Sequence, residues 1–548
     1  MSEDSKNNQQ LMEKIVALCK RRGFIFQSSE IYGGINGFWD YGPLGAELKR
    51  NTKDYWWKCM TQWREDIVGI DATIIMHPDI WKASGHVDTF SDPMCDCLLT
   101  KKRFRADQID PQSGIVYSYT GAKDNVSGKT CDDSYSVLLF KGKPPESARK
   151  VAVEFYKMRG LSEPELLGET TAPIENTIRY NPDNGSLLSE PRPFNLMFQS
   201  HAGPIQSDEN KVYLRPETAQ AIFVQFKNVL ETSRMKVPFG IAQVGKAFRN
   251  EVTPRNFTFR SREFEQMELE FFIKPDEIVT QIAGDVASAD ENTPLPEPQP
   301  NWGWQAWHIY WVQQRLNWYE AIGLNRDTLE LYWQKKDELA HYARACVDIL
   351  YKFPFGTQEL EGIAARGAFD LTQHQEHSGK SMEYFDEEAK SRYVPHVIEP
   401  SAGADRLVLA LICNAYHEED VTDEKGKTET RVVMKFHPRV APFKAAVFPL
   451  LKNKPELVAK AREVLNLLRP HMNVFYDDAG AIGRRYRRQD EAGTPFCVTI
   501  DFETIEGIRT EGTDQGLKNT VTVRHRDSMR QERVPVDKLL GFLQEQIA

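Results

Sequence analysis

The chain has 548 residues, of which 41% are hydrophobic and 27% are charged, and its formal net charge is −10. A chain of this length is expected to form two to four globular domains. The sequence has no run of about 18 apolar residues, so we expect no membrane span. The acidic balance argues mildly against nucleic-acid binding, except through local basic patches. Eight scattered cysteines and a polar N-terminal stretch without a secretory signal predict a cytoplasmic protein.

The N-terminal region predicts helices followed by a strand. Residues 11–26 predict a short helix that ends in an apolar turn, and apolar residues then recur at helical spacing. These residues are Leu44, Leu48, Tyr55, Cys59 and Trp63. We expect this long amphipathic helix to end near Gly69 and residues 71–78 to form a short strand closed by Pro78.

Two stretches within the first 431 residues predict insertions. Residues 106–185 are polar and rich in glycine and proline, whereas residues 290–345 begin with a proline-rich surface loop and continue into aromatic residues at helical spacing. We interpret the aromatic residues of the stretch Trp304–Tyr351 as helical core. Between the two stretches, residues 194–272 predict antiparallel strands around a helix near Ala219–Asn228.

The charged run 417–431 predicts a linker, so we place a domain boundary near residue 432. After it, strand-like and helical segments alternate, which is typical of a small α/β domain. The fold class that follows is α+β, with an antiparallel-sheet domain over residues 1–431 and a small α/β domain over residues 432–548. No dinucleotide fingerprint, P-loop spacing, zinc signature or nucleophile elbow occurs in the sequence.

The strands within residues 241–272 carry most of the candidate chemistry. Side chains alternate faces along a strand, so Arg249 and Glu251 are expected to point the same way. One face of the return strand carries an aromatic ring, an amide and two carboxylates, from Phe264, Gln266, Glu268 and Glu270. Arginine can fork onto phosphate, and a carboxylate can hold an ammonium group or accept from an adenine amino group. The alternative is a solvated sheet face decorated with charges.

Two further sets of arginines are candidates for binding phosphate. Arg406 lies in the first turn of a predicted helix that follows a strand through Gly403, where a cation is unfavourable unless an anion binds beside it. The alternative there is a structural salt bridge. Near the C-terminus, a patch that is either solvated or binds RNA consists of Arg484, Arg485, Tyr486, Arg487 and Arg488.

Three ordered segments resemble the motifs of class II aminoacyl-tRNA synthetases. The long helix, strand and Pro78 resemble the dimer-forming motif 1, FRNE (248–251) with the return strand REFEQMELEFF resembles motif 2, and GADRL (403–407) resembles motif 3. The detailed sequences of several segments resemble those of glycyl-tRNA synthetases of the homodimeric type. These segments are GFWDYGPLGAELKRN, YLRPETAQAIF, FPFGTQELEGIAARGAFDL and EPSAGADR. The segment GAIGRRYRRQDEAGTPFCVTIDFET resembles an anticodon-binding domain. The resemblance spans roughly residues 11–545 and is weakest over 106–185.

The resemblance implies a class II catalytic domain followed by an anticodon-binding domain, with ATP as substrate, Mg²⁺, glycine and tRNA(Gly) as ligands, and a homodimer. Arg249 would hold the α-phosphate of ATP, and Glu251 would meet the adenine amino group. Phe264 and Arg406 would enclose the adenine ring, with Arg406 also facing the γ-phosphate. The other implied ATP contacts are Glu359, through bound Mg²⁺, and Asn250, Phe259, Arg260, Arg262, Glu263, Leu360, Gly403, Ala404 and Asp405.

The resemblance also implies where glycine and tRNA bind. Glycine would lie among Arg105, Glu217, Phe264, Gln266, Glu268, Glu399 and Ser401, and the arginine-rich patch 484–488 would contact the tRNA. Several carboxylates favour an ammonium group, and crowding at the Cα position by Ser401 would exclude alanine, because a permissive pocket distinguishes one methyl by only about 1–3 kcal/mol. The alternatives are a helix cap for Glu217 and a surface charge for Arg105.

The implied reaction has two steps. The glycine carboxylate attacks the α-phosphorus of ATP, giving glycyl-adenylate and pyrophosphate, and glycine then passes to the 3′-terminal ribose of the tRNA. Arg249, Arg406 and Mg²⁺ would supply positioning and charge neutralisation. One rival is a non-catalytic class II relative that binds nucleic acid as an accessory protein, which FRNE and GADR disfavour. Another is a synthetase of different specificity, which YLRPETAQ and EPSAG disfavour.

Overall fold

The computed structural model describes residues 3–422, 426, 428–507, 509–510, 513–514 and 516–547. The chain divides into two compact units, labelled unit 1 and unit 2 below. Unit 1 comprises residues 1–84, 201–248 and 255–548, and unit 2 comprises residues 85–200 and 249–254. The boundary near residue 432 stays a prediction, since these units divide the chain elsewhere.

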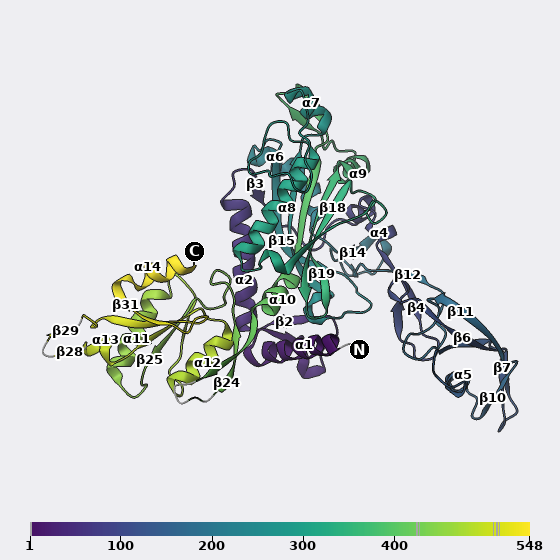
Figure 1. Ribbon diagram of the computed structural model, residues 1–548. Coiled ribbons are helices and arrows are strands. Elements are labelled where there is room, and N and C mark those ends of the chain that lie inside the picture. The colour runs from purple at the N-terminus through teal and green to yellow at the C-terminus, as the bar shows by residue number, and fades with distance from the viewer. Residues whose placement is uncertain are drawn as a thin grey trace. The chain divides into compact units, whose positions relative to one another are not determined.

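The centre of unit 1 is a seven-stranded sheet in the order β17-β18-β19-β22-β16-β15-β3 (Figure 1). All neighbouring strands are antiparallel except β3 and β15, which are parallel. The strand bounds are β3 Ile67–Gly69, β15 Phe239–Phe248, β16 Glu263–Ile273, β17 Leu329–Trp333, β18 Ala345–Phe353, β19 Gly356–Gly367 and β22 His396–Gly403. The antiparallel sheet expected from residues 194–272 is therefore confirmed.

The two faces of β16 are different, as the alternation of its residues predicts. Met267, Leu269 and Phe271 belong to the apolar core that includes α8 (Trp304–Ala321) and α10 (Ala404–Ala415). Phe272, on the other face, packs in a second core with α6 (Ala219–Ser233). The aromatic residues of α8 are thus helical core, as predicted, whereas the later part of the predicted helical stretch, up to Tyr351, forms strands β17 and β18 instead. The sheet is covered on both faces.

The long N-terminal helix is confirmed, but it ends at Gln62 instead of near Gly69, and the strand after it is not where the sequence predicted. Helix α2 (Pro43–Trp57) continues as the π-helix η2 (Lys58–Gln62), and the strand is β3, Ile67–Gly69, instead of 71–78. A Cβ at Gly69 would lie 2.2 Å from the Trp57 ring, so only glycine fits here between the helix and the strand. Pro78 begins the helix α3 (Pro78–Ala83), where its fixed φ suits the first turn.

The C-terminal part of unit 1 is a small α/β arrangement, as expected. Its five-stranded sheet has the order β26-β25-β27-β30-β31, and its core contains residues of α11 and α14. The strands are β25 Ala445–Pro449, β26 Val474–Tyr476, β27 Phe496–Ile500, β30 Thr520–His525 and β31 Gln531–Pro535. The helices are α11 Pro455–Leu468, α12 Ile482–Ala492, α13 Phe502–Glu506 and α14 Val536–Ile547.

The charged run before this part is not a linker. It contributes to an antiparallel hairpin of β23 (Tyr416–Thr422) and β24 (Thr428–Met434), while residues 423–425 and 427 lie outside the described residues. Arg431 is buried because its guanidinium donates to Asp490 of α12 (2.9 Å) and pairs with Glu419 (3.0 Å). The sequence interpretation missed strand β24 because its charged residues are typical of a linker, whereas ion pairs hold Arg431 of this strand in place.

Unit 2 contains the predicted insertion 106–185 and has a core of its own. Three small sheets form it, in the orders β12-β4-β5, β11-β6-β9 and β10-β7-β8. Helix α5 (Glu146–Met158) packs against β9 (Tyr135–Phe140), where the rings of Tyr135 and Phe155 stack 3.8 Å apart. The other strand bounds are β4 Ser91–Asp96, β5 Arg103–Arg105, β6 Gln112–Tyr119, β7 Gly121–Asp124, β8 Thr130–Cys131, β10 Pro164–Leu167, β11 Thr170–Thr177 and β12 Arg192–Asn195.

The remaining elements are short or lie at the edges of these layers. Within the described ranges, no helix has both the length and the apolarity that a membrane span requires. The bounds of the elements not yet given are α1 Glu3–Arg22, α4 His86–Thr89, α7 Asp276–Ala283, α9 Phe369–Ser378, β1 Ile25–Gln27, β2 Trp39–Tyr41, β13 Gln199–His201, β14 Lys211–Tyr213, β20 Tyr384–Asp386, β21 Ser391–Tyr393, β28 Arg509–Thr510, β29 Thr513–Asp514, η1 Glu30–Tyr32, η3 Ala106–Gln108, η4 Asp208–Asn210, η5 Phe257–Phe259 and η6 Arg326–Thr328.

Candidate active site

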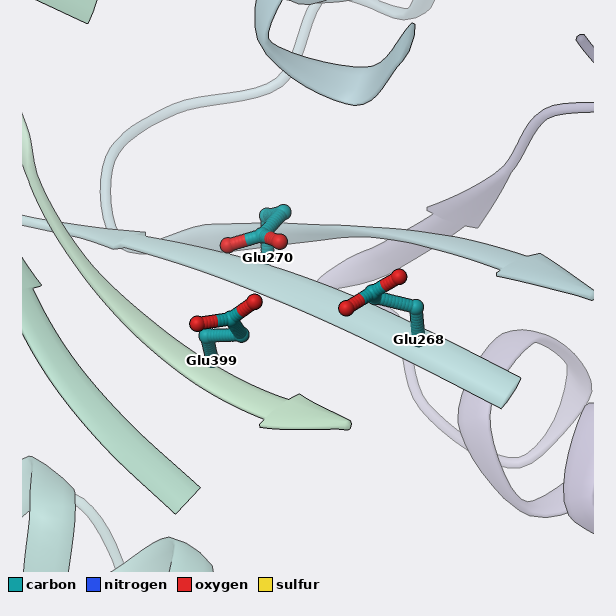
Figure 2. A group of neighbouring side chains, drawn as sticks. All are labelled: Glu268, Glu270 and Glu399. Carbon is teal, nitrogen blue, oxygen red and sulfur yellow. The ribbon is translucent and has the colours of Figure 1, made fainter. Parts of the chain in front are cut away.

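Three glutamates lie together on the polar face of the central sheet. Glu268 and Glu270 project from β16 and Glu399 from the neighbouring strand β22 (Figure 2). One carboxylate oxygen of each lies within 4.8 Å of the others, and all three side chains are buried. We call this set the carboxylate cluster. Like charges repel strongly in such a setting, so the cluster requires protons or a cation.

Strand register explains why these residues meet. Glu268 pairs with Ser401, and Phe271 pairs with Ile398, so Glu270 stands opposite Glu399. Residues opposite one another in an antiparallel pair present their side chains on the same face. The sequence predicted the shared face of Glu268 and Glu270, but it gave no register between β16 and β22.

Arg366 supplies a positive charge beside the cluster. This buried guanidinium donates to both oxygens of Asp370 (2.8 Å each) and to Glu399 (2.8 Å). It also lies over the Tyr342 ring at 3.9 Å. Such paired, planar donors suit carboxylates, so Arg366 both stabilises the acidic face and could meet the carboxylate of a small ligand. Sequence reasoning missed Arg366, which lies at the end of β19 while its partners Asp370 and Glu399 come from α9 and β22.

Polar groups of α6 and its N-terminal approach surround Glu268. The hydroxyl of Thr218 donates to Glu268, and the Thr218 amide donates to the Gln266 side chain (3.2 Å). Gln266 in turn donates to the Ser401 hydroxyl (3.4 Å). Glu217, half-buried just before α6, accepts from Gln220 (3.0 Å). The structure therefore brings together Glu217, Gln266, Glu268, Glu399 and Ser401 of the predicted glycine site.

Burial and mutual repulsion perturb the acids of the cluster. Burial, followed by repulsion from Glu217, raises the pKa of Glu268. Burial and the neighbouring Glu399 hold the pKa of Glu270 well above its ordinary range. For Glu399, burial outweighs the attraction of Arg366 and raises the pKa to about 8. Carboxyl groups kept partly neutral at pH 7 in a buried polar site are a mark of functional sites.

A second group of residues surrounds Arg406 at the start of α10. Its guanidinium lies 4.5 Å from the centre of the Phe259 ring and 3.3 Å from a carboxylate oxygen of Glu359. The salt-bridge alternative for Arg406 is thus observed, and the side chain is also 31% exposed beside an aromatic ring, while its contact with phosphate stays a prediction. An oxygen of Asp348 and an oxygen of Glu359 both lie within 4 Å of the position that a Cβ would take at Gly362.

Other residues of the predicted ATP site have partners within unit 1. Asp405 is buried and accepts from Tyr41 (2.6 Å), Lys49 (2.7 Å) and the Glu265 amide (2.6 Å), which joins α10 to α2 and β16. Glu263 pairs with Lys246, and Arg262 donates to the Asn36 carbonyl oxygen (2.9 Å). Leu360 is core and offers only its backbone, while the remaining predicted residues lie near the turn or strand ends: Arg260, Phe264, Gly403 and Ala404.

Four predicted site residues belong to unit 2. Arg249, Asn250 and Glu251 follow the end of β15, so they are not strand residues as the sequence predicted, and the Arg249 guanidinium lies 5.5 Å from the Phe90 ring centre. Arg105 pairs with Asp92 (2.8 Å) and Asp107 (2.6 Å), and hydrogen bonding to Asp107 raises its pKa. Arg105 is therefore held within its own unit by ion pairs rather than being a free surface charge.

The arginine patch of α12 divides into an inner and an outer set. Arg485 is buried and donates to backbone carbonyl oxygens of Pro449, Asp478 and Gly480, because helical spacing turns it inward. The Tyr486 hydroxyl is hydrogen-bonded to Thr499 (2.7 Å), with Arg524 over its ring. The residues on the outer side are Arg484, Arg487 and Arg488, of which Arg488 donates to Asp477 (2.9 Å).

Comparison with known proteins defines the class. Residues 200–292 match the tRNA synthetase class II core domain (G, H, P, S and T), and residues 444–546 match the anticodon binding domain. The antiparallel sheet with its buried acidic face and the α/β part that follows are thus those of a class II aminoacyl-tRNA synthetase. ATP is the substrate that such ligases share.

The particular family follows from full-length relatives. The chain is 45% identical to the glycine–tRNA ligase of Rhodopirellula baltica, covering 98% of this chain and 99% of the relative. It is 45% identical to that of Thermobifida fusca (98% of each) and 46% identical to that of Chlorobaculum tepidum (97% and 99%). The chain belongs to the glycine–tRNA ligase family. The non-catalytic accessory protein is correspondingly not favoured.

Proposed function

We propose that this chain is an ATP-dependent ligase that activates glycine as glycyl-adenylate and transfers it to tRNA(Gly). The observation that carries the proposal is the carboxylate cluster with Arg366 beside it. Glycine offers only an ammonium group, a carboxylate and the absence of a side chain, and this face offers buried carboxylates with the guanidinium of Arg366 beside them. The names of the full-length relatives support the same reaction.

Selection of glycine rests on charge and on bulk. Glu217, Glu268 and Glu399 would surround the ammonium group with negative charge, and Arg366 would meet the substrate carboxylate. Ser401, hydrogen-bonded by Gln266, would lie where a larger amino acid carries its Cβ. Because one methyl is worth only about 1–3 kcal/mol in a permissive pocket, this steric exclusion would supply most of the discrimination against alanine.

ATP would bind at the Arg406 end of the face. The Phe259 ring under Arg406 offers an aromatic surface, and the guanidinium offers phosphate a forked donor. Glu359 and Asp348 both present carboxylate oxygens beside Gly362, and oxygen ligands are those that Mg²⁺ prefers. When bound, Mg²⁺ would neutralise phosphate charge. Arg249 keeps its proposed α-phosphate role on the strength of the FRNE motif alone.

In the activation step, the chain would act by positioning the substrates and neutralising charge, and not by covalent catalysis. Arg366 and the carboxylate cluster would hold glycine so that its carboxylate faces the α-phosphorus, and Arg406 would offset charge that develops on the phosphates. Fixed donors of this kind act most strongly where water is excluded, as on this buried face. We further propose that the active form is a homodimer in the cytoplasm, as motif 1 and the family indicate.

Aminoacylation tests the proposal directly. With ATP, Mg²⁺ and tRNA(Gly), the purified chain is expected to form acid-precipitable glycyl-tRNA, and with tRNA(Ala) and alanine it is expected to form none. Charging of tRNA with alanine or serine but not glycine would leave the class intact and overturn the specificity. A folded chain that charges no tRNA with any of the three would overturn the ligase proposal.

The outer arginines of α12 give a prediction for tRNA binding. Arg484→Glu with Arg487→Glu is expected to weaken tRNA binding and to reduce the salt slope of log K by about one for each phosphate that the chain no longer neutralises. The exposed Arg469→Glu in the same part of the chain is the matched control. Glycine activation without tRNA should be the same in the double variant, the control and the parent chain. An unaltered salt slope in the double variant would contradict the assignment.

A further inference from the structure

Glu270 differs from the other two acids of the cluster in accepting no hydrogen bond. Both of its carboxylate oxygens are buried without a partner among the described residues, and the side chain is 0% exposed. A buried carboxylate in this state is costly unless it is neutral or a cation meets it. The predicted glycine site gave no role to this residue.

The backbone places Glu270 in direct opposition to a like charge. Glu399 lies opposite Glu270 in the register of β16 and β22. The next residue, Pro400, has no amide hydrogen that could be donated to a carboxylate. Like charges directly opposite one another in a sheet destabilise it. Glu270 and Glu399 are therefore an unfavourable pair in the absence of a ligand, as expected if the two carboxyl groups bind a cation together.

The charged groups around Glu270 do not neutralise it. They are Glu268 on its own strand, Glu399 on β22, Asp370 on α9 and Arg366 on β19. On the remaining neighbour, β15, the opposite residue is Ile241. The hydrogen bonds of Arg366 go to Asp370 and Glu399, not to Glu270. Among the described residues, Glu270 and these three other carboxyl groups thus share one guanidinium, that of Arg366. The buried Arg215 and the half-buried Glu217 act on the neighbouring Glu268.

We propose that Glu270 holds a proton while the amino-acid site is empty and releases it when the ammonium group of glycine enters the carboxylate cluster. The O–H bond of the Glu270 carboxyl group breaks, the proton passes to solvent, and the resulting carboxylate accepts an N–H from the ammonium group, which keeps its three protons. At the cluster the ammonium charge replaces the charge of the released proton, and the carboxylate of glycine adds one negative charge beside Arg366. This inference rests on the proposed function for the identity of the ligand.

The stoichiometry of donors and acceptors supports this exchange. A primary ammonium group has three N–H donors, one for each carboxylate of the cluster. Mg²⁺ is a poorer match, since it usually keeps several waters and this face is buried. Burial and Glu399 raise the pKa of Glu270 well above its ordinary value, which agrees with a carboxyl group that is neutral before the ligand arrives.

Calorimetry of glycine binding to the full chain tests the coupling. Titrations at one pH in two buffers of different ionisation enthalpy are expected to show release of about one proton per glycine bound. Glu270→Gln, an isosteric neutral side chain, is expected to release about one proton fewer per glycine bound than the parent chain. Glu330→Gln, which removes an exposed glutamate at the edge strand β17, is the matched control and should behave as the parent chain.

The affinity for glycine gives a second, independent readout that needs no variant. The Kd of the parent chain is expected to fall as pH rises toward neutrality, by up to about tenfold per pH unit, because the proton competes with the ammonium group. A Kd independent of pH, no proton release, or equal release in Glu270→Gln would overturn the inference while glycine binding itself persists. Absence of any glycine binding would instead overturn the proposed function, and this inference with it.

Discussion

Arg366→Met is expected to lower the free energy of unfolding by about 3–5 kcal/mol, because removal of one partner leaves buried charges uncompensated. Arg366 is 4% exposed in its side chain and bonds to both Asp370 and Glu399. The variant should also fail to activate glycine, since the proposed partner of the substrate carboxylate is removed. Urea denaturation measures the first effect, and glycine-dependent ATP–pyrophosphate exchange measures the second.

The pH dependence of this destabilisation has a definite sign. Arg366 lowers the pKa of Glu399 and Glu270 against the effect of burial, so without it both acids bind protons more tightly in the folded chain. A folded-state pKa above the unfolded value makes stability fall as pH rises through that interval. The deficit of Arg366→Met should therefore be smaller at pH 4 than at pH 8.

A surface arginine provides the control for Arg366. Arg392 is exposed on β21, and Arg392→Met should change the free energy of unfolding by less than about 1 kcal/mol, as is usual for surface substitutions. If Arg366→Met is as mild as Arg392→Met and still activates glycine, the assignment of Arg366 to the acidic face and the substrate is wrong.

Arg406→Ala is expected to slow ATP–pyrophosphate exchange by about 10²–10³-fold, the range seen when one preorganised charge-stabilising donor is removed. Its stability should change little, because Arg406 is 31% exposed and its partner Glu359 is 47% exposed. The decrease should appear in kcat as well as in the KM for ATP, since the guanidinium would act on charge that develops during the reaction.

The control for Arg406 is an exposed arginine with a similar surface salt bridge. Arg326 pairs with Glu320 at 3.0 Å, and Arg326→Ala should leave exchange within about twofold of the parent chain. If Arg406→Ala exchanges as fast as Arg326→Ala, the salt bridge with Glu359 is only structural, and the ATP site lies elsewhere.

The local sequence pattern predicted which residues of one strand share a face, but it did not predict which residues of other strands they contact. Alternation along β16 predicted that Gln266, Glu268 and Glu270 share a face, because strand period is a local property. Arg366 was missed because its importance depends on Glu399, which lies 33 residues away in sequence and meets it only through the pairing of β19 with β22. Register between strands that are distant in sequence is not a local property.

Charge density misled the sequence interpretation in two places. The run 417–431 looked like a linker, yet its Arg431 is buried by Asp490 and Glu419. In α12 the consecutive arginines looked equivalent, but the helix turns Arg485 inward to carbonyl oxygens. In both cases a buried ion pair or hydrogen-bond set satisfies a charge that sequence reasoning places in solvent.

Amino-acid-dependent ATP–pyrophosphate exchange tests the central claim, that the carboxylate cluster and Arg366 make a site for activating glycine. Purified chain, ATP, Mg²⁺ and a panel of glycine, alanine, serine and proline are sufficient, and no tRNA is needed. We expect exchange with glycine alone, and its disappearance in Arg366→Met and Arg406→Ala. Exchange with a different amino acid, or equal exchange by the parent chain and Arg366→Met, would contradict the account.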